Sequence, residues 1–302
     1  MGSAHHVGHS PTYICFRLVR LRTIDTLKMK LIHYLKIVIP LLLPSLIGGC
    51  SVLQGGKLLA PESFGLIPLT PDIYVETGTD EATRTQLRDA MVKAESAIRT
   101  AYGSVKSRPV VHACVSETCF EKFGGRGAQR AKIYGNNILL SPRGLNWHYL
   151  AHEWSHDEIR TRLTFNAWWH MPQWFDEGLA VAISAAPENA ESHWQYLIAA
   201  HVSRPTREEL HTFKSLSQWS DAVRRYGETK NLERKARGEP EIRPVYTAAG
   251  HELRPWLAKA GTSGLLAFIA QLNDSKDFES AYQTIDITVE RDAPQTALPP
   301  SH

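Results

Sequence analysis

Residues 149–160 read YLAHEWSHDEIR and contain the pattern His-Glu-x-x-His. On a helix, His152 and His156 project in the same direction one turn apart, which is the separation at which two imidazoles can bind a single zinc ion. Glu153 is displaced around the helix, so its carboxylate can reach a water on that ion without being a ligand. Because so short a pattern can arise by chance in a chain with 14 histidines, a metal site requires a further ligand.

A catalytic zinc usually has three protein ligands and one open position. His148 precedes His156 by eight residues, about 12 Å along a helix, so these two cannot share one ion with His152. A carboxylate is available in WFDEGLA, where Glu177 follows His156 by 21 residues. In this segment the apolar side chains can pack inward while Glu177 points toward the site. Two histidines and one glutamate leave a position open, which favours a catalytic over a structural ion.

HEWSH followed by WFDEGLA resembles the gluzincin (peptidase MA-like) metallopeptidases, in which a second helix carries a W-x-x-E-G-x-A-type motif and supplies a glutamate ligand. The resemblance covers residues 138–184 and continues more weakly through the C-terminal helices. It implies one Zn²⁺ per chain held by His152, His156 and Glu177. It also implies that a zinc-activated water hydrolyses a peptide bond, with Glu153 as general base and later as proton donor to the leaving amine.

Two roles in the family pattern have more than one candidate residue in this chain. Relatives use a Tyr or His from the helical half to stabilise the oxyanion; Tyr246 is the first candidate and His251 the second, while packing or surface roles are the alternative for each. Four residues after Glu177 stands Val181, where an aspartate would orient a zinc histidine. Asp157 and Asp176 are possible substitutes.

The strands and helices that are expected to position these residues together indicate an α+β fold. Strands are expected in DIYVET, PVVHACV and NNILLSP, with a turn at YGNN and a helix over Glu81–Tyr102. A helix from about residue 145 to 160 would bury the face of Trp147, Leu150, Ala151 and Trp154. The resemblance implies a zincin-like arrangement of a small mixed sheet, an N-terminal helix, the active-site helix and a mostly helical C-terminal half. Trp168, Trp169 and Trp174 are expected in the core around the zinc helices.

The segment NILLSPRGLN, just before the zinc helix, resembles the edge strand that many zincins present to an extended substrate. From this position we expect residues 138–141 to bind a peptide by strand addition. Such binding reads the substrate backbone more than its side chains.

The N-terminal part is typical of an exported protein. From Met29 a short basic start and an apolar run lead to Ile-Gly-Gly-Cys, which resembles the lipobox of bacterial lipoproteins and predicts lipidation of Cys50; an ordinary signal peptide is the alternative. Ser51, a non-acidic residue directly after the cysteine, resembles the pattern of lipoproteins that are transported to the outer membrane. The expected organisation is an over-called or non-native start at 1–28, a lipoprotein signal at 29–49, a tether at 50–70, a zincin-like domain at 71–285 and a flexible tail at 286–302.

The charge balance and the cysteines argue against two classes of protein, nucleic-acid-binding proteins and zinc ribbons. Residues 1–49 hold six Lys or Arg and one acidic residue, so the remainder has 28 basic and 30 acidic side chains and shows no sign of nucleic-acid binding. In an exported protein, Cys114 and Cys119 are expected to form a disulfide; two unpaired thiols are the alternative. A zinc ribbon would need a second cysteine pair in this part of the chain.

The sequence therefore predicts a zinc peptidase of the bacterial cell envelope. It would be tethered to the membrane by a lipid on Cys50, face the periplasm and act on a peptide or protein substrate. One alternative is an inactive zincin-fold lipoprotein that serves as a binding or assembly module, although such a module has no use for Glu153. Another is a zinc amidase that acts on cell-wall peptides.

Overall fold

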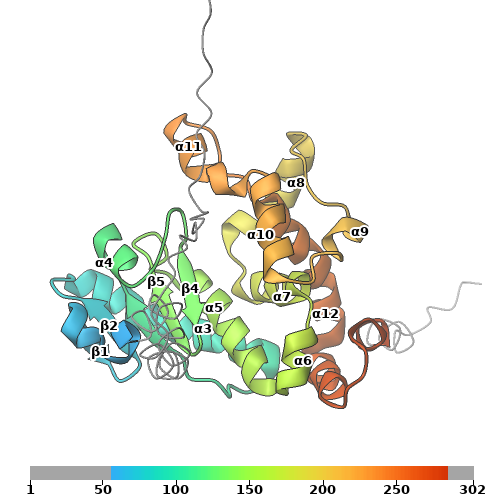
Figure 1. The fold of residues 1–302 in the computed structure, drawn as a ribbon, viewed down its shortest axis with the longest axis horizontal. Coiled ribbons are helices and arrows are strands. Elements are labelled where there is room, and N and C mark those ends of the chain that lie inside the picture. The colour runs from blue at the N-terminus through green and yellow to red at the C-terminus, as the bar shows by residue number, and fades with distance from the viewer. Residues whose placement is uncertain (1–55, 285–302) are drawn as a thin grey trace, which may run out of the picture. The chain divides into compact units, whose positions relative to one another are not determined.

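The computed structural model describes residues 56–284, which have an α+β fold (Figure 1). The leader, Cys50 and the tail at 286–302 lie outside the described residues. The elements, in chain order, are η1 (Pro61–Phe64), β1 (Leu66–Thr70), β2 (Ile73–Glu76), α3 (Glu81–Tyr102), β3 (Val110–Ala113), α4 (Glu117–Lys122), β4 (Ala131–Tyr134), β5 (Asn137–Leu140), α5 (Trp147–Arg162), α6 (Phe165–His170), α7 (Gln173–Ser184), η2 (Pro187–Asn189), α8 (Glu191–Ala199), α9 (Arg207–Leu210), α10 (Leu216–Arg225), η3 (Glu228–Lys230), α11 (Asn231–Ala236) and α12 (Pro244–Asn273).

The five strands form one mixed sheet in the order β1-β2-β3-β5-β4. The β1–β2 and β5–β4 pairs are antiparallel, whereas β2–β3 and β3–β5 are parallel. The parallel connection from β2 to β3 passes through α3, whose start at Glu81 is capped by the Asp80 side chain accepting from the Thr83 backbone N–H at 2.8 Å. The predicted helix over Glu81–Tyr102 is therefore confirmed.

Alternation along the strands gives the sheet two buried faces. Ile73, Val75 and Val111 point to the face covered by α3 and α5, and belong to the main core. On the other face, Leu66 and Leu139 pack with the α4 region, where Cys114 and Cys119 are joined by a disulfide.

Two boundaries differ from the sequence prediction. Residues 61–70, expected as part of a tether, form η1 and β1; Leu66 is 1% exposed and β1 pairs with β2, so the folded part begins before residue 71. The second difference concerns the edge strand. Because β5 is hydrogen-bonded to β3 on one side and β4 on the other, residues 138–140 are internal, and β4 is the strand at that end of the sheet.

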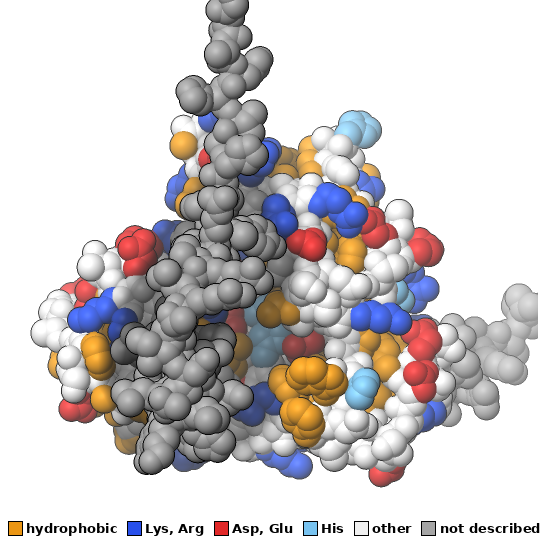
Figure 2. Space-filling model, in the orientation of Figure 1, with side chains coloured by type: hydrophobic (Ala, Val, Ile, Leu, Met, Phe, Trp, Pro, Cys, Tyr) orange, Lys and Arg blue, Asp and Glu red, His pale blue; other side chains and the backbone are white. Residues whose placement is uncertain are grey.

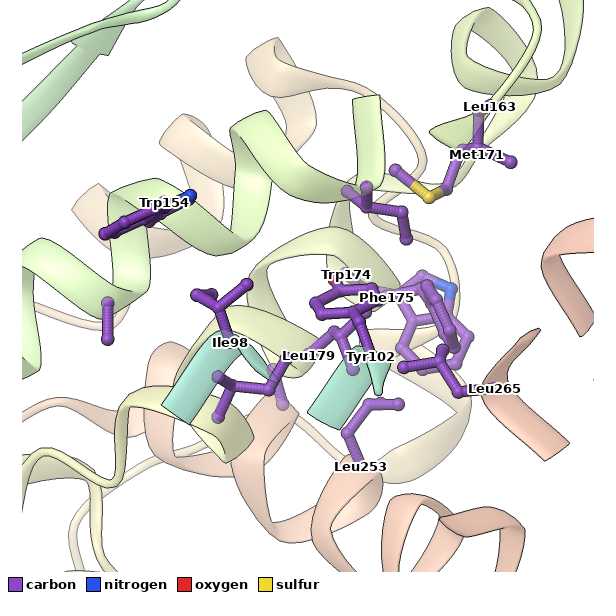
Figure 3. Packing of buried hydrophobic residues seen from close by; sticks show 14 of the residues in the cluster. Ile98, Tyr102, Trp154, Leu163, Met171, Trp174, Phe175, Leu179, Leu253 and Leu265 are labelled. Carbon is purple, nitrogen blue, oxygen red and sulfur yellow. The ribbon is translucent and has the colours of Figure 1, made fainter. Parts of the chain in front are cut away.

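The helical half is assembled on α7. This helix contacts α5 and α12, and Figure 3 shows Trp174, Phe175 and Leu179 of α7 packed with side chains of α3 and α12. Gly178 permits this closeness, because a Cβ there would lie 2.9 Å from the Ala249 carbonyl oxygen in α12.

The tryptophan prediction holds in part. Trp174 is buried and Trp168 is partly buried, but Trp169 is 68% exposed beside the exposed Phe165. Figure 2 shows exposed hydrophobic side chains in the region of α6. Within the described residues, none of the helices combines the length and apolar character needed to cross a bilayer.

Candidate metal centre

Helix α5 is held in place by a buried polar network on the side away from the proposed ligands. Glu158 is fully buried and accepts hydrogen bonds from the Ser107 backbone N–H at 2.8 Å and from Arg162 Nε at 2.7 Å. The Trp154 indole N–H donates to Ser107 Oγ at 2.9 Å. At its start, α5 is capped by the side chain of Asn146, which accepts from the His148 backbone N–H. The network and the cap fix the rotation of α5 about its axis.

His152, His156 and Glu177 converge, as the sequence predicted, and could hold a metal ion. One ligand atom from each lies within 4.8 Å of the others, and the Glu177 oxygen Oε2 is 3.3 Å from His152 Nε2 and 3.8 Å from His156 Nε2. Two atoms bound tetrahedrally to one zinc at its usual bond lengths are about 3.3–3.6 Å apart. The observed separations fall at or just above that range.

The carboxylate of Glu177 is oriented for such a role. Its Oε1 accepts a hydrogen bond from Gln173 Nε2 at 3.1 Å, one turn earlier on α7. Its Oε2 is buried and has no hydrogen-bond partner among the described residues. A buried carboxylate oxygen facing two imidazole nitrogens is the donor arrangement that a divalent cation would complete.

Asp176 is the candidate carboxylate that lies beside a histidine of the centre, at ion-pair distance but without an aligned hydrogen bond. Its Oδ1 lies 2.9 Å from His156 Nδ1, on the opposite side of the ring from Nε2. Asp157, the other candidate, instead forms an ion pair with Arg160 at 2.5 Å. Val181 faces α12, where a Cβ on Gly250 would lie 2.4 Å from Val181 Cγ1, so this position is used for helix packing.

Negative charge gathers around the two imidazoles. Burial by itself lowers the pKa of His156, but the carboxylates of Asp176 and Glu177 more than offset this effect and raise that pKa to about 10. Burial raises the pKa of Glu153, although the His152 and His156 rings act in the opposite direction. Buried carboxylates require a compensating cation, and a metal ion bound by these groups would supply it.

A cavity of about 620 Å³ opens over the centre, and His152, Glu153, Glu177 and Tyr246 all line it. The Tyr246 ring lies 6.1 Å from the His152 ring and meets the Trp219 ring edge-on at 5.1 Å. Burial and the Glu177 carboxylate raise the pKa of Tyr246, so its hydroxyl stays protonated and can donate a hydrogen bond.

Other histidines that the sequence drew attention to lie away from the ligand atoms. His251 pairs with Glu191 at 2.9 Å, stacks on Trp194 and lines a different cavity. His148 directs Nδ1 to the Ser184 carbonyl oxygen at 2.6 Å. Tyr246 is thus the candidate donor that the fold brings to the centre.

Several cavity residues were not predicted, because distant segments supply them. Arg130, just before β4, pairs with Glu241 at 2.5 Å and with Glu188 at 3.5 Å. Tyr149 donates to Glu188, and Arg243 stands at the start of α12. The spacing of these residues in the sequence has no local periodicity that would have grouped them.

Comparison with known proteins adds no family assignment. No protein-family model and no curated protein matches the chain. The functional argument therefore depends on the geometry of the centre and on the motif resemblance.

Proposed function

We propose that this protein is a zinc-dependent peptidase with a zincin-like, gluzincin-type catalytic domain. The observation that carries the proposal is the convergence of His152 Nε2, His156 Nε2 and Glu177 Oε2, with Glu153 lining the same cavity as His152 and Glu177. A His-His-Glu donor set suits zinc and leaves a coordination position open for water or substrate. When bound, zinc supplies a Lewis acid that activates water and polarises a carbonyl.

The chain's own groups would carry the proton transfers. The Glu153 carboxylate takes a proton from the attacking water and delivers it to the nitrogen of the leaving amine. The Tyr246 hydroxyl donates a hydrogen bond to the substrate carbonyl oxygen as negative charge develops on it. Asp176 holds the His156 ring, and Gln173 holds the Glu177 carboxylate, so neither ligand has to reorient during the reaction.

We assign the peptide-binding edge to β4 in place of residues 138–141. β4 has β5 on one side and no strand on the other among residues 56–284, and Arg130 and Ala131 at its start line the cavity. An extended substrate could therefore add to β4 by backbone hydrogen bonds. A substrate-analogue complex with no peptide along β4 would remove this assignment.

The proposal includes export and tethering to the bacterial envelope through a lipid on Cys50, with the domain facing the periplasm. The disulfide between Cys114 and Cys119 supports an oxidising compartment.

The test compares the wild type with Glu153→Gln, which keeps the size and shape of the side chain but removes the base. We expect both proteins to hold equal zinc, whereas cleavage of a peptide library by the variant should fall by roughly 10²–10⁴-fold. Equal cleavage at equal zinc would contradict a base role for Glu153. Absence of cleavage by the zinc-loaded wild type would favour the binding module, and cleavage of peptidoglycan fragments alone would favour the amidase.

A further inference from the structure

Arg243 is a cation in the wall of the cavity whose guanidinium has no carboxylate within 4.0 Å among the described residues. The other partly buried arginines of this cavity are paired: Arg130 with Glu241 and Arg143 with Glu117, each at 2.5 Å. The Nε of Arg243 is buried and has no hydrogen-bond partner in residues 56–284. Burial lowers the pKa of Arg243, but Glu228 and Glu188 act through space and raise it overall; since neither lies within 4.0 Å of the guanidinium, its N–H donors suit an anionic ligand.

The nearby carboxylates are engaged elsewhere. The Glu228 oxygen Oε1 accepts from the Val245 backbone N–H at 2.5 Å, and burial raises the pKa of Glu228 to about 7, so part of its population is neutral at neutral pH. Glu188 accepts from Tyr149 and lies 3.5 Å from Arg130. These carboxylates offset part of the Arg243 charge without binding the guanidinium, which leaves its N–H donors available to a ligand.

A backbone hydrogen bond and a contact with a neighbouring ring position Arg243. The Arg243 backbone N–H donates to His193 Nε2 at 3.2 Å, and Arg243 Cζ lies 5.8 Å from the centre of the Tyr246 ring. The Tyr246 ring in turn lies 6.1 Å from the ring of His152. These two steps together correspond to at most about three to four residues of extended peptide, since each residue spans roughly 3.3–3.6 Å.

We propose that Arg243 binds a carboxylate of the substrate, located within about three to four residues of the bond that is cleaved. This proposal rests on the proposed peptidase function and names the substrate class: peptides that carry a carboxylate close to the scissile bond. A guanidinium presents two parallel N–H donors that match the two oxygens of a carboxylate. The carboxylate can be the free C-terminus of a peptide or an Asp or Glu side chain, and the chemistry of recognition is the same.

The test measures binding without turnover, using zinc-loaded Glu153→Gln protein and fluorescently labelled tetrapeptide pools of randomised sequence built from uncharged residues. One pool has a free C-terminal carboxylate, a second is C-terminally amidated, and a third is amidated but carries Glu at one of its last three positions. We expect the amidated pool to bind roughly tenfold or more weakly than a carboxylate pool. Stronger binding of the first or of the third pool identifies the source of the carboxylate.

Substitutions at Arg243 in the same protein assign the preference to this side chain. Arg243→Gln should abolish the preference, and Arg243→Lys should keep part of it because the charge remains while the paired donors are lost. Arg224→Gln is the matched control: it removes one positive charge from the rim of the same cavity, where Arg224 is exposed and paired with Asp221. We expect the control to keep the preference. Circular dichroism and zinc content verify that each variant is folded.

Equal binding of all three pools, a preference that survives Arg243→Gln, or no binding of either carboxylate pool at about 1 mM would overturn the proposal. Failure of the peptidase function gives a different result. In that case the zinc-loaded wild type cleaves no peptide, while the Arg243-dependent preference is still measured in the binding assay. Conversely, wild-type cleavage of all three pools with equal kcat/KM would leave the peptidase function in place and remove the carboxylate subsite.

Discussion

Replacement of Glu158 by alanine should strongly destabilise the domain, because this carboxylate connects α5 to the loop after α3. Glu158 is 0% exposed and accepts from the backbone N–H groups of Lys106 and Ser107, from Ser107 Oγ and from Arg162 Nε, at 2.7–3.1 Å. In the variant, the side chain of Arg162, 4% exposed, loses its carboxylate and keeps Ser104 as a hydrogen-bond partner and the Tyr102 ring as a contact. Removing one partner of a buried ion pair typically costs about 3–5 kcal/mol.

For a domain of this size, that loss corresponds to a decrease in Tm of about 6–20 °C. Thermal and urea unfolding followed by circular dichroism would measure it, with a chelator present so that metal binding does not add to the stability. Glu81→Ala is the control, since the Glu81–Arg88 pair is exposed and its loss should cost at most about 1 kcal/mol. A Glu158→Ala variant that lost no more stability than the control would refute the reasoning.

Three further predictions concern the centre and its support. Asp176→Asn should weaken zinc affinity by roughly 10–100-fold, measured by competition with a chelating dye, because His156 loses its orienting carboxylate; unchanged affinity would count against that role. Burial raises the pKa of Glu228 in the folded state to about 7, so its stability contribution is complete below pH 4.5 and is lost as the pH rises through 7. The free energy of unfolding of Glu228→Gln should therefore increase by roughly 1–3 kcal/mol relative to that of the wild type between pH 5 and pH 8.5. Urea unfolding measures this difference, and a difference that does not change with pH would contradict the raised pKa. Gly178→Ala should cost about 1–3 kcal/mol in the same assay, since the new Cβ would lie 2.9 Å from the Ala249 carbonyl oxygen, and a stabilised variant would show that α7 and α12 are not closely packed.

The convergence of the three candidate ligands could be predicted from the sequence because helical spacing determines which way each side chain points. Spacing of four residues places His152 and His156 on one helix face, and α5 extends from Trp147 to Arg162, close to the predicted bounds. Glu177 could be predicted because its helix has an apolar face that must turn toward the core, which points its carboxylate the same way. In each case the helical repeat determines the direction of the side chain, and this repeat can be read from the sequence.

The edge strand and the cavity wall could not be predicted in the same way. Strand order depends on contacts between separate segments, and the sequence offered only one signal: Ile138, Leu139 and Leu140 are all buried, an unbroken apolar run that is typical of a central strand. The exposed Trp169 shows a related limit, since three tryptophans close in sequence cannot all face one core. Arg243 lines the cavity because α12, which carries Tyr246 in its first turn, begins at the cavity wall.

The most direct test of the metal centre is the zinc content of the purified domain after dialysis against zinc and removal of loosely bound metal. We predict about one zinc ion per chain for the wild type, measured by elemental mass spectrometry. His152→Ala and Glu177→Ala should each bind far less, while Glu241→Gln, which lines the same cavity but pairs with Arg130 and is not in the ligand group, should retain the wild-type amount. A wild type without bound zinc, or a Glu177→Ala variant with the full wild-type content, would contradict the assignment of His152, His156 and Glu177 as the metal site.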